Sequence, residues 1–139
     1  MKKDGKKIFG YRDAMTLEEQ PKEMVIVGSG AIGIEFAYFY NALGTDVTVV
    51  EFQNEIAPNE DHDISKELGK ILKKKGINIL TNSEVVSSKI VDNKVKVDIE
   101  SDDKKFTIDC DVVLSAVGIK SNIENLSLIH ISEPTRHRR

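Results

Sequence analysis

The feature that most constrains this chain is a turn with three glycines, G-S-G-A-I-G at residues 28–33, between a short apolar run and a helical pattern. The apolar run, MVIV at residues 24–27, has the continuous hydrophobic character of a strand buried on both faces of a parallel sheet. After Ala31 the apolar residues recur at helical spacing as far as Leu43. A strand that turns directly into a helix begins the unit that builds a parallel sheet, so the turn predicts an α/β fold.

The rest of the chain extends this unit. Apolar runs at residues 47–50 and 77–80 predict two more buried strands, and the helix between them starts among acidic residues and ends in lysines, as its dipole favours. Residues 84–110 contain three runs of alternating polar and apolar residues, which predict antiparallel strands with one face in solvent. The apolar run at residues 112–118 returns to the parallel sheet. We therefore predict a Rossmann-like parallel sheet with two helices and an inserted three-stranded antiparallel meander.

Apolar spacing also predicts the buried face of each helix. The expected buried residues are Ile32, Phe36, Phe39, Tyr40 and Leu43 in the first helix, and Ile64, Leu68, Ile71 and Leu72 in the second.

The composition excludes several classes of function. A formal net charge of -3 argues against a nucleic-acid-binding surface or a basic membrane patch. No apolar run is long enough to span a membrane, so we expect a cytoplasmic protein. The single cysteine, Cys110, excludes an internal disulfide and a two-thiol redox pair, and we expect it to be buried and structural. The acids around His62 suit the start of a helix, so we expect no metal site.

The spacing of the three glycines matches a dinucleotide-binding loop. Gly28 would allow the tight turn out of the strand, Gly30 would let the backbone approach a pyrophosphate, and Gly33 would let the helix pack on the sheet. The phosphates would then lie at the N-terminus of the helix, where free N–H groups and the dipole favour negative charge. The plain alternative is an ordinary glycine-rich turn between a strand and a helix.

An acidic residue at the end of the next strand favours the dinucleotide interpretation. Glu51 lies about twenty residues after the glycine loop, where a carboxylate would accept hydrogen bonds from the adenosine ribose. It would repel the 2′-phosphate of NADP, and no arginine follows it in Phe52, Gln53 or Asn54, so NAD is favoured. A methyltransferase also ends its second strand with an acid, but its glycine loop is usually spaced differently.

Beyond these general motifs, the segment DAMTLEEQPKEMVIVGSGAIGIEFAYFYNALGTDVTVVEF, the lysine-ended helix and VVLSAVG resemble the NAD-binding domain of dihydrolipoamide dehydrogenase. This flavoenzyme belongs to the pyridine nucleotide–disulfide oxidoreductases. The resemblance covers residues 8–125 and implies FAD, a redox cysteine pair and a catalytic base in parts of the enzyme outside this chain. It also implies a homodimer within a 2-oxo acid dehydrogenase complex, with this domain packed against flavin and interface domains.

The resemblance assigns roles residue by residue. The glycine loop would line the pyrophosphate, Glu51 would hold the ribose, and Val85 would pack on the adenine. Glu35 and Gly118 would lie near the nicotinamide. The cofactor-binding residues expected on this basis are Gly28, Ser29, Gly30, Ala31, Ile32, Gly33, Glu35, Glu51, Val85 and Gly118, with no catalytic residue in the chain.

The same reasoning divides the chain into three parts. Residues 1–23 are polar with little pattern and are expected to be a connector from a flavin domain, followed by the NAD-binding domain at 24–125. Residues 126–136, LSLIHISEPTR, resemble the conceptual translation of a transposon-derived sequencing adaptor, so we expect 126–139 to be a non-native tail on a fragment of a longer enzyme. The alternatives are another NADH-linked disulfide reductase, an NADH oxidase, or a stand-alone NAD-sensing module.

Overall fold

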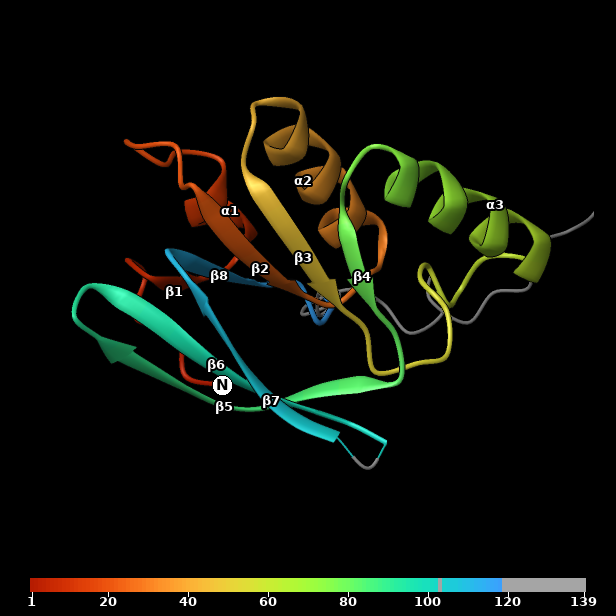
Figure 1. Ribbon diagram of the computed structural model, residues 1–139. Helices are drawn as coiled ribbons and strands as arrows, with labels where there is room; N and C mark the ends of the chain where they lie inside the picture. The colour runs from red at the N-terminus through yellow and green to blue at the C-terminus, as the bar shows by residue number, and fades with distance from the viewer. Residues whose placement is uncertain (103, 119–139) are drawn as a thin grey trace, which may run out of the picture.

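The computed structural model describes residues 1–102 and 104–118 and has three layers (Figure 1). The middle layer is a five-stranded parallel sheet in the order β1-β8-β2-β3-β4. Its strands are β1 (Ile8–Phe9), β2 (Glu23–Val27), β3 (Asp46–Val50), β4 (Asn78–Leu80) and β8 (Val112–Ser115). One face is covered by the helices α1 (Tyr11–Ala14), α2 (Ala31–Ala42) and α3 (His62–Lys74). The other face is covered by a separate antiparallel sheet of β5 (Ser83–Val91), β6 (Lys94–Ser101) and β7 (Lys104–Cys110).

The predicted fold class is confirmed, and the alternation of side chains along β2 explains the layering. Met24 and Ile26 belong to the core on the helical side of the sheet, whereas Val25 belongs to the core shared with the three-stranded sheet. Residues Val95, Val97 and Ile99 of β6 fill this second core. A parallel sheet needs cover on both faces, and here the antiparallel sheet supplies one of the two covers.

The structure adds two elements that the sequence pattern did not predict. Within the segment interpreted as a connector, Ile8 and Phe9 pair with Val113 and Leu114 of β8 and form one edge of the parallel sheet. The helical turn α1 follows directly, and the hydroxyl of Tyr40 on α2 donates to the carbonyl oxygen of Ala14 at 2.5 Å. A strand of two residues is too short to show any periodicity, which is why the pattern missed it.

The buried faces of the two long helices were predicted in part: Tyr40 and Leu72 are buried, and Phe36 and Leu68 pack against the core. In α2 the residues that face the sheet are Gly33, Ala37 and Tyr40, whereas Phe39 and Leu43 are exposed. In α3 the buried residues are Ser65 and Leu72, and Ile64 and Ile71 are exposed. Small residues let α2 approach the sheet closely, and apolar spacing identified Tyr40 on that face but not Gly33 or Ala37.

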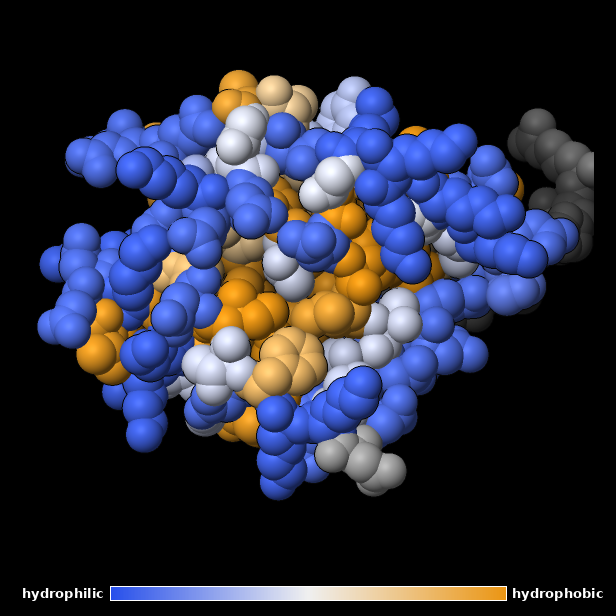
Figure 2. All heavy atoms as spheres, viewed as in Figure 1, coloured by the Kyte–Doolittle hydropathy of each residue, from blue (hydrophilic) through white to orange (hydrophobic). Residues whose placement is uncertain are grey.

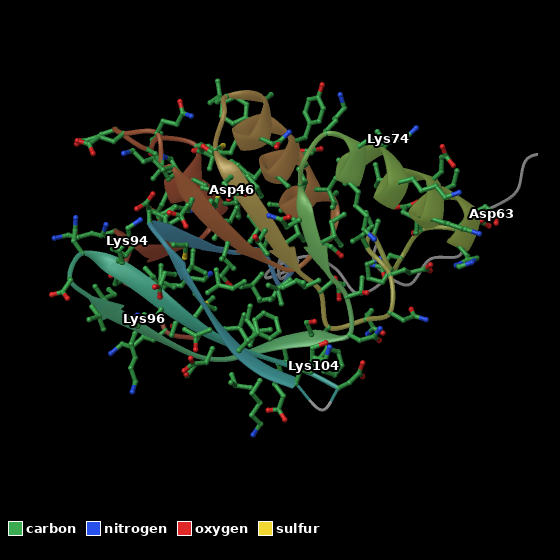
Figure 3. All side chains as sticks on the ribbon, in the orientation of Figure 1. Asp46, Asp63, Lys74, Lys94, Lys96 and Lys104 are labelled. Carbon is green, nitrogen blue, oxygen red and sulfur yellow. The ribbon has the colours of Figure 1, made fainter. Side chains whose placement is uncertain are left out.

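The charged residues at the two ends of α3 complement the helix dipole. Asp61 caps α3 by accepting a hydrogen bond from the backbone N–H of Asp63, and Asp63 and Lys74 lie at opposite ends of the helix (Figure 3). Acids at the N-terminus and lysines at the C-terminus complement the dipole, as predicted.

In the view of Figure 2, apolar side chains show between the helices and the antiparallel sheet, with hydrophilic residues around them.

No helix in residues 1–102 and 104–118 is long and apolar enough to cross a membrane. The tail predicted at residues 126–139 lies outside the described residues.

Candidate nucleotide site

A cleft of about 540 Å³ lies at the carboxyl ends of the parallel strands. The chain runs from β2 to β3 and β4 on one side, and β8 pairs with β2 on the other, so the strand order reverses between β2 and β8. Ligands of open parallel sheets bind at such a reversal. The lining segments are the glycine loop (residues 28–30), the ends of β2 and β3, residues 51–53, 58–59, 83–85 and 115–118, and Met1.

The first and third glycines are required by the backbone itself. Gly28 has a φ of +103°, and a Cβ there would lie 2.5 Å from the carbonyl oxygen of Ala116. A Cβ on Gly33 would lie 2.2 Å from the carbonyl oxygen of Gly28. Gly28 therefore forms the turn beside β8, and Gly33 lets α2 begin directly against that turn.

Gly30 differs from its two neighbours in the motif. Its φ is -68°, which any residue adopts, and a Cβ there would meet nothing within 4 Å. It occupies the N-cap of α2 without a side-chain cap, and the first turn of α2 carries no acidic residue. The N–H groups that begin a helix have no partner within the helix, so this end of α2 suits an anion.

Hydrogen bonds hold the Glu51 carboxylate beside the glycine loop. Its Oε1 atom accepts from the backbone N–H of Ser29 at 3.1 Å and from the Ser29 hydroxyl at 2.5 Å. Its Oε2 atom accepts from the backbone N–H of Gln53 at 2.8 Å. Glu51 is only 7% exposed, and three donors offset the cost of burying its charge.

Backbone hydrogen bonds also fix the strand ends that surround the cleft. The N–H of Gly28 donates to the carbonyl oxygen of Val50 at 2.9 Å, and that of Ala116 donates to Val27 at 2.7 Å. The N–H of Ser83 donates to the carbonyl oxygen of Glu51 at 3.0 Å, which brings β5 against the end of β3. The strand ends that line the cleft are therefore held in place by the sheet.

The structure brings six of the ten predicted site residues into this one cleft: Gly28, Ser29, Gly30, Glu51, Val85 and Gly118. The other four, Ala31, Ile32, Gly33 and Glu35, lie along α2 outside the lining. Ala31 and Glu35 are exposed, and Gly33 is buried against the glycine loop.

Sequence reasoning missed several lining residues. Phe52 directly follows Glu51, is 67% exposed and lines the cleft. Ser115, Ala116 and Val117 line the cleft from the end of β8. All of them lie within two residues of the end of a parallel strand, and the rule that strand ends meet at one edge of the sheet would have found them.

The other candidates do not form a site within residues 1–102 and 104–118. No group of three His, Cys, Asp or Glu residues there could hold a metal ion. His62 pairs with Glu55 at 2.6 Å on the surface. Cys110 is buried and free, and burial raises the pKa of its thiol to about 12, so it is inert near neutral pH.

The arrangement is that of a known group of proteins. The sequence pattern of the pyridine nucleotide-disulphide oxidoreductase family matches residues 2–136. The chain belongs to this family. With a single cysteine, this family member lacks a pair of redox cysteines within its 139 residues.

Relatives within the family share both sequence and fold with the chain. Dihydrolipoyl dehydrogenase from Rhizobium etli is 43% identical over 126 residues, covering 90% of this chain and 26% of that protein. The Bacillus subtilis enzyme of the same name is 36% identical over 127 residues, covering 90% of this chain and 27% of that protein. LpdA from Mycobacterium tuberculosis superposes with a TM-score of 0.75 at 30% identity, covering 90% of this chain and 27% of that structure. The chain therefore spans about a quarter of the length of the curated relatives it matches.

Proposed function

We propose that the cleft binds NAD(H) and that the chain is the NAD-binding domain of a dihydrolipoamide dehydrogenase. The observation that carries this proposal is the open backbone at Gly30, with space for a ligand and the free N-terminus of α2, beside the buried Glu51 carboxylate. A pyrophosphate fits the first feature and a ribose diol fits the second. The adenosine would lie in the part of the cleft between Gly30 and Val85. The nicotinamide would lie against residues 115–118.

In the parent enzyme the role of this chain is placement. NAD⁺, when bound, accepts a hydride at its nicotinamide ring. The chain would hold the pyrophosphate at Gly28 and Gly30, fix the ribose at Glu51, and leave the nicotinamide end open for a flavin supplied by another domain. We expect no catalysis from the chain by itself, because its single cysteine is buried and lies outside the cleft lining.

The preference for NAD over NADP follows from the same carboxylate. Glu51 is held as a hydrogen-bond acceptor by three donors, so it would bind the ribose 2′-hydroxyl and repel a 2′-phosphate. No arginine or lysine lies among the residues that line the cleft in the described part of the chain.

The dihydrolipoamide enzyme is favoured over other disulfide reductases by relatives in sequence such as the Rhizobium etli enzyme, at 43% identity. A structure of RclA, a flavoprotein disulfide reductase from Escherichia coli, also superposes with a TM-score of 0.70 at 30% identity. Either kind of parent enzyme would use the proposed nucleotide site, so the binding test below applies to both.

Calorimetric titration of the chain with NADH and then with NADPH tests the proposal. We expect binding of NADH, little binding of NADPH, and loss of about tenfold or more in NADH affinity in Glu51→Ala, since a hydrogen bond to a charged group contributes about 1.5–3 kcal/mol. Glu100→Ala removes a carboxylate on β6 outside the cleft lining and is the matched charge control. Absence of NADH binding by a chain with native circular dichroism would refute the proposal.

A further inference from the structure

Ser29, the residue between the first two glycines, is fully buried at 0% exposure. Its hydroxyl donates to Glu51 Oε1 at 2.5 Å and lies 3.2 Å from the backbone N–H of Ala57, from which it accepts. Its carbonyl oxygen accepts from the same N–H at 2.9 Å. One serine therefore joins the glycine loop both to the end of β3 and to the loop that precedes α3.

The connection continues to α3 through Ala57. The carbonyl oxygen of Ala57 accepts from the hydroxyl of Ser65 at 2.9 Å, and Ser65 is buried in the first turns of α3. Two buried hydroxyls thus bind the backbone of Ala57, that of Ser29 at its N–H and that of Ser65 at its carbonyl oxygen. The loop after Glu51, which includes the lining residues Phe52, Pro58 and Asn59, is held at a fixed distance from the glycine loop.

These contacts decide which carboxylate oxygen is free for a ligand. A carboxylate oxygen offers about two acceptor sites, and Ser29 fills both on Oε1 with its N–H and its hydroxyl. Within residues 1–102 and 104–118, Oε2 accepts only from the N–H of Gln53, so it keeps one acceptor site there. A ribose hydroxyl can therefore be recognised at Oε2, in the orientation that Ser29 imposes on the side chain.

We propose that Ser29 is a positioning residue for nucleotide selectivity: its hydroxyl fixes Glu51 so that Oε2 recognises the adenosine ribose. The proposal rests on the proposed function, because it assigns a task within the same site. Without the hydroxyl, Oε1 keeps only the N–H of Ser29, and the carboxylate gains rotational freedom that binding must then remove. The backbone hydrogen bond from Ala57 to the Ser29 carbonyl remains, so the loop keeps its anchor.

The test uses the complete 139-residue chain in a double-mutant cycle of Ser29→Ala and Glu51→Ala, titrated with NADH and NADPH. We expect Ser29→Ala to weaken NADH binding about tenfold, to leave NADPH binding almost unchanged, and so to reduce the preference for NADH. In the Glu51→Ala background the same change should alter NADH affinity by less than about twofold.

Two further variants separate positioning from general damage. Ser29→Cys replaces the hydroxyl by a larger group that is a weak donor, so it should lose NADH affinity as Ser29→Ala does without leaving the space of the hydroxyl empty. Thr45→Ala removes another buried hydroxyl, which donates to the carbonyl oxygen of Pro21 at 2.7 Å, and should leave both affinities unchanged.

The outcomes are distinguishable. Equal losses for NADH and NADPH, a full loss that persists without Glu51, or no loss in either Ser29 variant would each overturn the positioning role while leaving the NAD site intact. Failure of the folded wild-type chain to bind NADH would instead overturn the proposed function together with this inference.

Discussion

Gly30→Ala is the change that best separates a ligand site from a plain structural turn. Gly30 has an ordinary φ of -68°, and its added Cβ would meet no atom within 4 Å. The fold should therefore accept the methyl group. The expected cost in the free energy of unfolding is at most about 1 kcal/mol, because alanine is a poorer N-cap than glycine.

The effect on binding should be much larger than the effect on folding. If a pyrophosphate approaches the backbone at Gly30, the methyl group would occupy its place and push it away from the N–H groups of α2. Losing one hydrogen bond to a charged oxygen costs about 1.5–3 kcal/mol, and a weaker helix-terminus interaction adds about 0.3–1 kcal/mol. We expect NADH affinity to fall by about 2 kcal/mol or more, which is roughly 30-fold.

Gly28→Ala is the matched variant with the opposite expectation. Its Cβ would be forced to 2.5 Å from the Ala116 carbonyl oxygen, and its φ of +103° is unfavourable for alanine. The left-handed backbone costs about 1–2 kcal/mol, and moving β8 away would also disturb the hydrogen bond from Ala116 to Val27. We expect a loss of about 2–4 kcal/mol in unfolding free energy.

The assay is urea unfolding followed by circular dichroism, together with calorimetric titration of NADH, on the same preparations of the wild type and both variants. Gly30→Ala should unfold near the wild-type midpoint and bind poorly, whereas Gly28→Ala should unfold at lower urea. Wild-type NADH affinity in a folded Gly30→Ala chain would refute the reasoning, since no phosphate could then lie against that backbone.

Two predictions concern groups outside the cleft lining. Because burial raises the pKa of the Cys110 thiol to about 12, the thiol ionises first in the unfolded chain, and stability should fall as pH rises above about 9. Between pH 8 and pH 10, urea unfolding should show a fall of about 1 kcal/mol in the free energy of unfolding that Cys110→Ala lacks; an equal fall in both proteins would contradict this. Burial acts to raise the pKa of Asp111, but the hydrogen bonds from Lys94 and from the N–H groups of Glu23 and Lys22 outweigh it and keep the pKa below its usual value. The stabilisation from Asp111 is then present above about pH 4 and is lost as pH falls through the folded-state pKa. Asp111→Asn should lower unfolding free energy by about 1 kcal/mol at pH 7, more than the exposed control Asp109→Asn, and the difference should shrink near pH 3.

The fold could be predicted from the sequence wherever a segment was long enough to show a period. Strands β2, β3, β4 and β8 were indicated by apolar runs, and the three strands from β5 to β7 by alternation. Strand β1 could not be predicted, because two residues carry no period; the structure shows it by its pairing with β8. The wrongly predicted members of the helix faces, Phe39, Leu43, Ile64 and Ile71, have a similar cause. Residues Gly33 and Ala37 face the sheet because they are small, whereas hydrophobicity ranked larger neighbours higher.

The candidate site was also predicted only in part from the sequence. Motif spacing placed the glycine loop and Glu51 together because both are anchored to the ends of adjacent strands, β2 and β3. The contact of Ser29 with Ala57 could not be predicted, since it joins residues on separate loops without a pattern in either. Contacts between loops depend on the exact path of each backbone, and local sequence determines that path only in part.

The three glycines of the loop do not carry equal information about function. An ordinary turn from a strand to a tightly packed helix already requires Gly28 and Gly33, because a Cβ at either would collide with backbone atoms. The same turn does not require Gly30, where the backbone angle is ordinary and the space is open. The open space at Gly30, at the N-terminus of α2 and near a buried carboxylate held by Ser29, therefore supports the proposal that the cleft binds a ligand with a phosphate and a ribose.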